Sequence, residues 1–470
     1  MGMAESLGEP MYFEQFYLGC LAHASYMIGS EGEAVVVDPQ RDVDLYLKAA
    51  DEHHLKIKYI FETHLHADFV SGHRELAART GAQICIGAAA GAAFPHLALR
   101  DGSQVRVGNV LIRTLETPGH TPEGTCLVIT DEEKSSRPYA VLTGDTLFIG
   151  DVGRPDLSKT HTPQELAGLM YDSLHQKLMA LPDDVIVYPA HGAGSLCGRS
   201  MRAERSSTIG TERLTNHALQ IKSREEFIRE LTTNLPSRPD YFLQDAEINR
   251  AGAGALGELP TLRSFSANEL MNDLDRGGVA LDVRPGDSFA AGHVPGSVNI
   301  PLSGQFATWA GIVLGLSSQP ILIAETPEQI EEARMRLARV GIEDVRGYLA
   351  GGVDSWRSAG MKVAQVPQMT VEELRQRLAA DGSRVLDVRR QGEWESGHIA
   401  GADCYALDNF HSAMPAMPKG ERLAVHCKSG YRSIIACSLL QRAGHDVTNV
   451  IGGFDAWQNA GLPVEASVKA

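Results

Sequence analysis

The second half of the chain repeats itself, and this repeat constrains the fold more than any other feature of the sequence. Leu281-Asp-Val-Arg284 recurs as Leu386-Asp-Val-Arg389, and Gly351-Gly352 recurs as Gly452-Gly453. Each copy alternates short apolar strands with helices, a pattern typical of a parallel sheet with functional groups at the carboxyl ends of its strands. We therefore predict two α/β domains in tandem: a middle copy over residues 258–366 and a last copy over 367–470.

The first half, expected to form a domain over 1–250, also alternates strands with helices. Four segments are short, apolar and rich in β-branched residues, and we expect buried strands there: 34–37, 57–61, 139–143 and 185–188. A hairpin is expected through Gly108-Asn109, and a helix over 74–80 is expected to end at Gly81. Proline and glycine residues between 236 and 257 predict a linker before the two copies.

The composition excludes one class of partner and indicates a compartment. The formal net charge is −16, and affinity for nucleic acid depends on Lys and Arg, so we expect no nucleic-acid partner. Residues 1–12 lack the apolar core of a signal peptide, and the apolar-looking stretch 306–316 is too short to span a membrane. The seven cysteines are irregularly spaced, which favours free thiols in a reducing cytoplasm.

Histidine and aspartate residues gather at the ends of the strands predicted in the first half. His64-Leu-His66-Ala-Asp68 follows the strand expected at 57–61. Three more candidates stand at the ends of later strands: His120, Asp145 and His191. A single histidine would be interpreted as an ordinary hydrogen-bonded side chain, but four such elements in this order indicate a metal site. Imidazole and carboxylate ligands together suit Zn, Fe or Mn better than a soft thiolate site would.

These motifs resemble the metallo-β-lactamase superfamily over residues 12–234. The resemblance implies an αββα sandwich, which we expect over residues 1–250. The superfamily usually has a further histidine directly after the Asp of the first motif, and Phe69 stands at that position here. The missing imidazole would normally help to hold a second metal ion, so Phe69 favours a site with one metal.

Within that superfamily the chain looks like a persulfide dioxygenase. Besides Phe69 and Gly72, two runs carry this resemblance: 150–156, with the sequence GDVGRPD, and 191–198, with the sequence HGAGSLCG. It implies that glutathione persulfide, or a similar small thiol persulfide, is oxidised by O₂ to sulfite and free thiol. In that family iron supplies the redox chemistry, and the protein supplies open coordination positions and a shaped pocket.

Three residues of this chain match the metal ligands of that family. Matched motif by motif, the resemblance implies one Fe(II) per chain, held by His64, His120 and Asp145. Two imidazoles and one carboxylate leave coordination positions open for a sulfur anion and O₂. A further set is expected to orient the ligands and water, although the superfamily also uses these positions as ligands: His66, Asp68 and His191.

Two more residues are expected near the substrate. Arg154 stands where the family places an arginine beside the substrate carboxylates, and an arginine fork suits a carboxylate. A structural salt bridge explains this arginine equally well. Cys197 follows His191 closely and is a candidate carrier of persulfide at the mouth of the site, but a small core residue is at least as good an interpretation.

The last copy carries a candidate nucleophile. Cys427 stands between a predicted strand that ends at His426 and an apolar helix that begins at Ile434. The short loop between them contains Gly430, and such a loop aims backbone N–H groups and the helix N-terminus at the sulfur. This arrangement stabilises a thiolate or a persulfide anion.

The last copy resembles the rhodaneses over residues 369–464. The resemblance rests on the cysteine loop and on the motifs that the two copies share. It implies transfer of sulfane sulfur through a covalent persulfide on Cys427, with persulfide, sulfite and thiosulfate as reaction partners. Lys428 and Arg432 are expected to attract these anions.

The middle copy keeps the rhodanese pattern without the chemistry. No cysteine occurs between Cys197 and Cys404. Glu325 follows the strand that matches the one before Cys427, and Glu331 falls near the place of the loop arginine. Acidic residues there would repel the anions that the last copy attracts. We interpret the middle copy as an inactive rhodanese that packs against or separates the two working domains.

The sequence thus predicts an α/β enzyme, an iron-dependent persulfide dioxygenase fused to two rhodanese domains with parallel sheets, acting in sulfide detoxification. The fusion would raise the effective concentration of the shared intermediate. The direction of sulfur transfer and the oligomeric state stay open. One alternative is a glyoxalase-II-like zinc thioester hydrolase, against which Phe69 counts. Another is a non-catalytic sulfur-trafficking protein, against which the intact set His64, His120 and Asp145 counts.

Overall fold

The structure is a computed structural model that describes residues 11–233, 235, 237–380, 384–411 and 421–466. It divides into two compact units, and each is described by itself. The first unit comprises residues 1–258 together with 338–341, and the second comprises 259–337 and 342–470.

The first unit is built around two six-stranded sheets. Their strand orders are β1-β2-β3-β4-β5-β6 and β12-β11-β10-β9-β8-β7. The strands of the first sheet are β1 (Tyr12–Leu18), β2 (His23–Ser30), β3 (Glu33–Val37), β4 (Lys56–Glu62), β5 (Gln83–Gly87) and β6 (Leu97–Leu99). Those of the second are β7 (Gln104–Val107), β8 (Val110–Glu116), β9 (Thr125–Asp131), β10 (Ala140–Gly144), β11 (Ile186–Pro189) and β12 (Ser207–Thr208).

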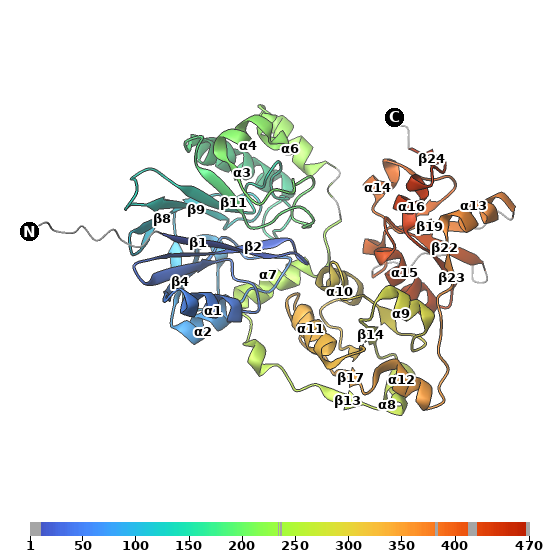
Figure 1. The fold of residues 1–470 in the computed structure, drawn as a ribbon. Coiled ribbons are helices and arrows are strands. Elements are labelled where there is room, and N and C mark those ends of the chain that lie inside the picture. Colours follow the sequence, from blue (N-terminus) through green and yellow to red (C-terminus); the bar gives the residue numbers. More distant parts are fainter. Residues whose placement is uncertain (1–10, 234, 236, 381–383, 412–420, 467–470) are drawn as a thin grey trace, which may run out of the picture. The chain divides into compact units, whose positions relative to one another are not determined.

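The two sheets pack face to face, and helices cover their outer faces (Figure 1). One buried cluster joins the inner faces, for example Phe61 with Leu127. Tyr46 packs against the outer face of the first sheet, and Met170 against that of the second. The helices of this unit are α1 (Asp44–Glu52), α2 (His73–Thr80), α3 (Pro163–Gln176), α4 (Ile209–Thr215), α5 (His217–Gln220), α6 (Arg224–Thr232) and α7 (Phe242–Ala251). The predicted αββα sandwich is confirmed.

Local sequence signals explain where several elements begin and end. The hairpin β7–β8 turns through Gly108, whose φ of 52° suits a residue without a Cβ atom. Helix α2 ends at Gly81, with φ 73°. Helix α6 begins after Ser223, whose side chain accepts a hydrogen bond from the Glu226 backbone N–H. The expected hairpin and helix end are therefore present.

The second unit contains two five-stranded sheets in which every pairing is parallel. Their orders are β13-β17-β16-β14-β15 and β18-β23-β22-β19-β21. The strands of the middle copy are β13 (Arg263–Phe265), β14 (Ala280–Asp282), β15 (Val298–Asn299), β16 (Ile321–Ile323) and β17 (Gly347–Leu349). Those of the last copy are β18 (Gln368–Met369), β19 (Arg384–Asp387), β21 (Asp403–Cys404), β22 (Arg422–His426) and β23 (Asp446–Val450), with a separate pair β20 (His398–Ile399) and β24 (Val464–Glu465). The predicted parallel sheets are confirmed.

Helices alternate with these strands in both copies. Those of the middle copy are α8 (Ala267–Leu274), α9 (Gly286–Ala291), α10 (Phe306–Leu314), α11 (Pro327–Ala338) and α12 (Gly352–Ser358). Those of the last copy are α13 (Val371–Ala380), α14 (Gln391–Glu395), α15 (Tyr431–Arg442) and α16 (Gly453–Asn459). Within the described residues, none of the helices is long and apolar enough to cross a lipid bilayer.

The same buried ion pair anchors each copy. In the middle copy Arg284 Nη2 lies 2.6 Å from Asp282 Oδ2, and in the last copy Arg389 Nη2 lies 2.6 Å from Asp387 Oδ2. Each arginine also donates to a glycine carbonyl at the start of the following turn. The repeated Asp-Val-Arg motif is thus a structural device, since it fixes the segment that follows β14 in the middle copy and β19 in the last copy.

Candidate functional sites

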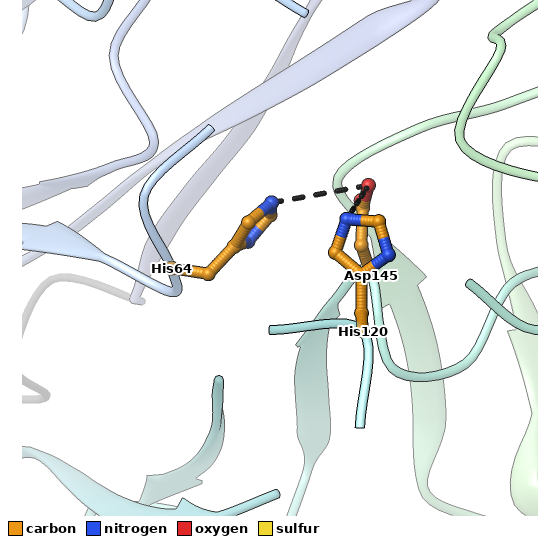
Figure 2. A group of neighbouring side chains, drawn as sticks. All are labelled: His64, His120 and Asp145. Carbon is orange, nitrogen blue, oxygen red and sulfur yellow. Dashed lines mark ion pairs between the residues drawn. The ribbon is translucent and has the colours of Figure 1, made fainter. Parts of the chain in front are cut away.

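Three predicted ligands converge at one edge of the sandwich in the first unit. His64 follows β4, Asp145 follows β10, and His120 lies in the loop between β8 and β9. Figure 2 shows both rings pointing toward the carboxylate: Asp145 Oδ2 lies 3.9 Å from His64 Nε2 and 3.3 Å from His120 Nε2. All three residues are buried, and their ligand atoms lie within 4.8 Å of one another.

The three atoms that face one another fit a metal ion. His64 Nε2, His120 Nε2 and Asp145 Oδ2 are buried and have no hydrogen-bond partner, a costly state that a cation would relieve. Burial lowers the pKa of His64 well below its ordinary value and also lowers that of His120, so both rings keep a free lone pair. Burial alone would raise the pKa of Asp145, but the neighbouring histidines, His191 first, hold it well below its ordinary value.

Hydrogen bonds on the far side of each ring set the orientation of the ligands. His120 Nδ1 lies 2.9 Å from the carbonyl oxygen of Arg154, to which it donates. His64 Nδ1 lies 3.0 Å from Thr63 Oγ1, and Thr63 donates to Asp38 Oδ2 over 2.8 Å. Since Nδ1 is the donor in both rings, Nε2 is left as the acceptor that a metal requires.

His191 links the carboxylate of the ligand set to a second carboxylate. Its Nδ1 lies 2.7 Å from Asp145 Oδ1, and its Nε2 lies 2.9 Å from Asp68 Oδ2. Burial alone would lower the pKa of His191, but Asp145 and Asp68 raise it well above its ordinary value. A protonated His191 therefore stabilises the ionised form of Asp145 and fixes its orientation.

Cys197 lies inside this centre. It is buried, and its sulfur lies within 4.8 Å of ligand atoms of Asp68 and His191, so this trio is a second group able to hold a cation. Burial, with Asp68 and Asp145 nearby, raises the pKa of the Cys197 thiol well above its ordinary value. The thiol is thus protonated at neutral pH.

Phe69 and His66 complete the wall of the centre: the His66 ring centroid lies 4.2 Å from that of His64, but His66 Nε2 faces two other carboxylates. His66 Nε2 lies 3.1 Å from Asp38 Oδ1 and 3.6 Å from Glu62 Oε2. The Phe69 ring is buried, with its centroid 4.2 Å from that of the His23 ring. An apolar ring thus fills the position where the superfamily usually has another imidazole.

Arg154 is held by an acidic neighbour. Its Nε and Nη2 donate to the two carboxylate oxygens of Asp156 over 2.6 and 2.8 Å, and Nη1 donates to the carbonyl oxygen of Leu196 over 3.3 Å. Because its own carbonyl accepts from His120, the segment around Arg154 positions a ligand. Its role in substrate binding stays a prediction.

The cysteine of the last copy sits at a strand-to-helix turn, as predicted. Cys427 follows β22 and precedes α15, and the Gly430 N–H donates to Cys427 Sγ over 3.1 Å. Gly430 caps α15 with φ 110°, a conformation that favours glycine. Ser433 Oγ lies 3.7 Å from the same sulfur. The backbone donor and the start of the helix therefore stabilise negative charge on Cys427.

The two predicted cations of this loop differ in their surroundings. Lys428 is exposed to solvent. Arg432 forms a two-pronged ion pair with Glu393, with N–O distances of 2.6 and 2.7 Å. Burial alone would lower the pKa of Arg432, but Glu393 raises it. Arg432 is thus a permanent cation in a fixed position, partly neutralised by its partner.

The structure identifies the residue that replaces the nucleophile in the middle copy. A Cβ atom on Gly453 would approach the Cys427 carbonyl oxygen to 2.4 Å, and one on Gly352 would approach the Ala324 carbonyl oxygen to 2.6 Å. Ala324 therefore occupies the place of Cys427. Three residues further along, Pro327 stands where the last copy has Gly430, and a proline has no N–H to donate.

Two carboxylates that orient functional side chains were not predicted from the sequence. Asp38 binds Thr63 behind His64, and Glu393 binds Arg432. Asp38 directly follows a predicted strand, which is the signal that could have revealed it. Glu393 recurs nowhere in the middle copy, where Ser288 stands at the matching position, so the repeat gave no signal for it.

The fold and the two sites define a metallo-β-lactamase-fold protein joined to tandem rhodanese domains. The profile of the Metallo-beta-lactamase superfamily matches residues 18–191, and that of the Rhodanese-like domain matches 266–359 and 370–460. The human protein "Persulfide dioxygenase ETHE1, mitochondrial" is 32% identical over 238 residues, covering 49% of this chain and 84% of that protein. The chain belongs to the persulfide dioxygenase family and carries two rhodanese domains.

Two other known proteins are also similar to this chain. A crystal structure described as a metallo-beta-lactamase from Staphylococcus aureus subsp. aureus COL has a TM-score of 0.66 and 33% identity, covering 72% of this chain and 99% of that chain. The hydroxyacylglutathione hydrolase of Rhodopseudomonas palustris (strain BisB18) is 31% identical over 220 residues, covering 46% of this chain and 77% of that protein. The first of these likenesses extends beyond the metallo-β-lactamase unit.

Proposed function

We propose that this enzyme uses O₂ to oxidise the sulfane sulfur of a small thiol persulfide, such as glutathione persulfide, to sulfite. The observation that carries this proposal is the convergence of three buried ligand atoms without hydrogen-bond partners, on His64, His120 and Asp145. Membership in the persulfide dioxygenase family supports Fe(II), one ion per chain, as the metal. When bound, iron supplies the redox chemistry with O₂.

The protein's own residues prepare this centre in three ways. His64 and His120 present neutral Nε2 atoms because Thr63 and the Arg154 carbonyl take up the other ring nitrogens. The protonated His191 keeps Asp145 ionised and oriented. The ligands and Phe69 are buried, so bulk water is excluded from the place where the persulfide sulfur is oxidised. The reaction consumes O₂ and one water per persulfide anion and releases thiol, sulfite and a proton.

We propose further that the last copy transfers sulfane sulfur through Cys427. The Cys427 thiolate attacks the outer sulfur of a donor, thiosulfate or a thiol persulfide; the donor's S–S bond breaks, and sulfite or a thiolate leaves with the electron pair. An acceptor then attacks the outer sulfur of the enzyme persulfide, and the electron pair returns to Cys427 Sγ. The Gly430 N–H supports the negative charge at that atom.

A zinc thioester hydrolase is a second candidate, favoured by a specific observation. Asp68, His191 and Cys197 form a group able to hold a second cation beside the first three ligands. The likeness to the Rhodopseudomonas hydroxyacylglutathione hydrolase is of the same order as that to the persulfide dioxygenase. Metal analysis distinguishes the two candidates, because the hydrolase requires zinc-bound hydroxide and the dioxygenase requires iron.

The deciding experiment is anaerobic purification followed by iron and zinc analysis and oxygen uptake with glutathione persulfide. We expect one iron per chain, with sulfite formed in proportion to O₂ consumed. His120→Ala should lose both iron and oxygen uptake, whereas the exposed His161→Ala should retain both. Two zinc ions per chain with thioester turnover, or oxygen uptake that survives His120→Ala, would overturn the proposal.

The proposed compartment is the cytoplasm. All seven cysteines are free thiols in the structure, although several are buried close to other side chains. Free thiols are typical of proteins from reducing compartments. The named human relative is mitochondrial, so localisation of the tagged full-length chain is the direct test.

A further inference from the structure

One buried loop carries several residues of the metal centre and has no regular structure of its own. It comprises residues 63–72, between β4 and α2, and it contains the predicted ligand His64 and, further along, Asp68 and Phe69. Every residue of this loop is buried. Because buried backbone N–H and C=O groups need partners, other segments of the chain have to supply them.

Asn249, on α7, holds the second half of this loop from one side. Its Nδ2 donates to the carbonyl oxygens of His66 and Phe69, each over 2.8 Å. Its Oδ1 accepts from the Ser71 N–H over 2.8 Å. The buried amide thus binds the loop on both sides of Val70, whose own N–H has a different partner.

That partner comes from a segment far along the chain. The Val70 N–H donates to the carbonyl oxygen of Arg339 over 2.7 Å. Arg339 falls within the middle copy's stretch of sequence, directly after α11, but residues 338–341 belong to the first compact unit. A carbonyl group at the end of a helix has no partner inside the helix, so it is available to accept. Val70 is fully buried, and its N–H would be costly to leave unpaired.

The side chain of Arg339 fixes the position of this carbonyl group. Its Nε and Nη2 donate to the two carboxylate oxygens of Asp42 over 2.9 and 3.0 Å. Its Nη1 lies 3.6 Å from Cys20 Sγ. Asp42 belongs to the turn between β3 and α1. A two-pronged ion pair sets both distance and orientation, so it holds Arg339 in register with the loop that contains Val70.

The contact reaches a metal ligand through the neighbours of Val70. Asp68 Oδ2 lies 2.9 Å from His191 Nε2, and His191 Nδ1 lies 2.7 Å from Asp145 Oδ1. Phe69, the residue between Asp68 and Val70, is fully buried. A shift of the Val70 backbone therefore displaces the carboxylate that holds His191, and His191 in turn orients Asp145.

We propose that Arg339 is a positioning residue of the metal centre, so that a segment from the cysteine-free copy's stretch of sequence completes the dioxygenase site. This inference rests on the proposed metal site. Loss of the contact frees the Val70 N–H and loosens the chain from Asp68 through His191 to Asp145. Metal release then becomes faster and turnover slower, whereas substrate affinity is unchanged, because the contacts of Arg339 are with Val70, Asp42 and Cys20.

The test compares Arg339→Gln with Arg339→Lys in the full-length, metal-loaded enzyme. Glutamine removes the two-pronged pair, whereas lysine keeps the charge. Hydrogen exchange of the peptide that contains Val70 and the rate of metal release to a chelator are measured beside oxygen uptake with glutathione persulfide. In Arg339→Gln we expect exchange and metal release to be at least about fivefold faster. We expect kcat to fall about fivefold or more with KM within about twofold, and Arg339→Lys to recover at least about half of kcat.

Arg346→Gln is the matched control. Arg346 forms a similar ion pair, 2.6 Å from Asp273, but both residues belong to the second unit. We expect this variant to behave as the wild type in all three measurements. If Arg339→Gln does not fold, Asp42→Asn weakens the same pair and is measured in its place.

Two results would overturn the inference. One is exchange at Val70 and metal release within about twofold of the wild type after the pair is broken. The other is an equal change in Arg346→Gln, which would indicate a general loss of stability. A wild-type protein that binds metal but consumes no oxygen contradicts the proposed function alone, because hydrogen exchange and metal release still test the role of Arg339.

Discussion

The two rhodanese domains share one frame but differ in the loop that carries the chemistry. In both, a buried Asp–Arg pair stands at the end of one strand, β14 or β19, and a Gly–Gly turn packs on the carbonyl of the residue that follows the neighbouring central strand, β16 or β22. That residue is Cys427 in the last copy and Ala324 in the middle copy. The comparison teaches that a few buried contacts maintain the rhodanese fold of each copy, which we call the frame. The sulfur chemistry depends on a separate and smaller set of residues in the loop after the central strand.

The loops themselves show what that shorter set contains. The last copy offers the Gly430 N–H to the sulfur and holds Arg432 in an ion pair. At the matching positions the middle copy has Pro327 and Gln329. It has therefore lost the sulfur, one backbone donor and one cation, yet its sheet is intact. A domain that keeps its frame after losing its nucleophile can still supply a positioning residue to another site.

The largest expected effect is the loss of sulfur transfer in Cys427→Ser. A serine hydroxyl is a poor nucleophile here and forms no persulfide, so thiosulfate-to-thiol transfer should fall at least about a thousandfold. Persulfide-dependent oxygen uptake should stay within about twofold, because the metal ligands belong to the other unit. Cys404→Ser, at the end of β21, is the control and should retain both activities. Loss of both activities in folded Cys427→Ser protein would show that the two chemistries are not separable.

Removing the buried Asp–Arg pair should lower the free energy of unfolding of each copy by a similar amount. Asp282→Asn and Asp387→Asn each leave a buried arginine without its charged partner, and we expect about 3–5 kcal/mol of lost stability in either case. Urea unfolding measures the loss of stability, and limited proteolysis at increasing urea concentrations shows which copy unfolds first. Asp354→Asn removes an exposed pair with Arg357 and should cost less than about 0.5 kcal/mol. A much smaller cost in the middle copy would mean that its frame is maintained by something other than this pair.

The pH dependence of stability should separate the two copies. Burial alone would raise the pKa of Glu393, but Arg432 lowers it below its ordinary value of 4.5. A lowered pKa gives stability above the unfolded-state value, and this stability is lost as pH falls through the folded-state value. We expect about 0.5–1 kcal/mol of acid-sensitive stability in the last copy, reduced by solvent because the pair is partly exposed.

Glu393→Gln should remove this acid-sensitive contribution, so that the variant loses less stability than the wild type when the pH falls below 4.5. Urea unfolding between pH 3 and 7 measures the difference. The middle copy, with Ser288 at the matching position, should show no equivalent contribution. An unchanged pH profile in the variant would mean that the Glu393–Arg432 pair contributes no stability.

Much of this architecture was predictable because its signals are local. The strand-end position of His64, His120 and Asp145 follows from apolar runs that stop at polar residues, and the tandem α/β domains follow from the repeat. Which side chains these residues bind was not predictable, because the partners come from distant segments; the position of Asp38 after a strand marks it as a candidate but not as the partner of Thr63. Nothing in the sequence near Thr63 indicates that Asp38 accepts its hydroxyl, and nothing near Arg432 points to Glu393.

Positions relative to other domains were equally inaccessible. The sequence indicated that the middle copy lacks a cysteine, but the contact of Tyr431 with Pro301 depends on how two separately folded sheets pack. Arg154 shows the same limit: its spacing from Asp145 allowed a substrate contact or a salt bridge, and in the folded protein Asp156 lies beside its guanidinium. Packing between elements decides such cases, and a single sequence records it only indirectly.

The smallest expected effect is the sharpest test of the comparison. Ala324→Cys, made in the Cys427→Ser background, restores a sulfur to the middle copy but should give less than about a hundredth of wild-type transfer. Pro327 cannot donate an N–H to that sulfur, and the neighbouring Glu325 disfavours a thiolate. Adding Pro327→Gly should raise transfer measurably, and the reaction rate of the new thiol with iodoacetamide at pH 7 reports its thiolate fraction. If Ala324→Cys alone reached a tenth of wild-type transfer, the rhodanese fold would be sufficient for sulfur transfer and the loop residues would contribute little to it.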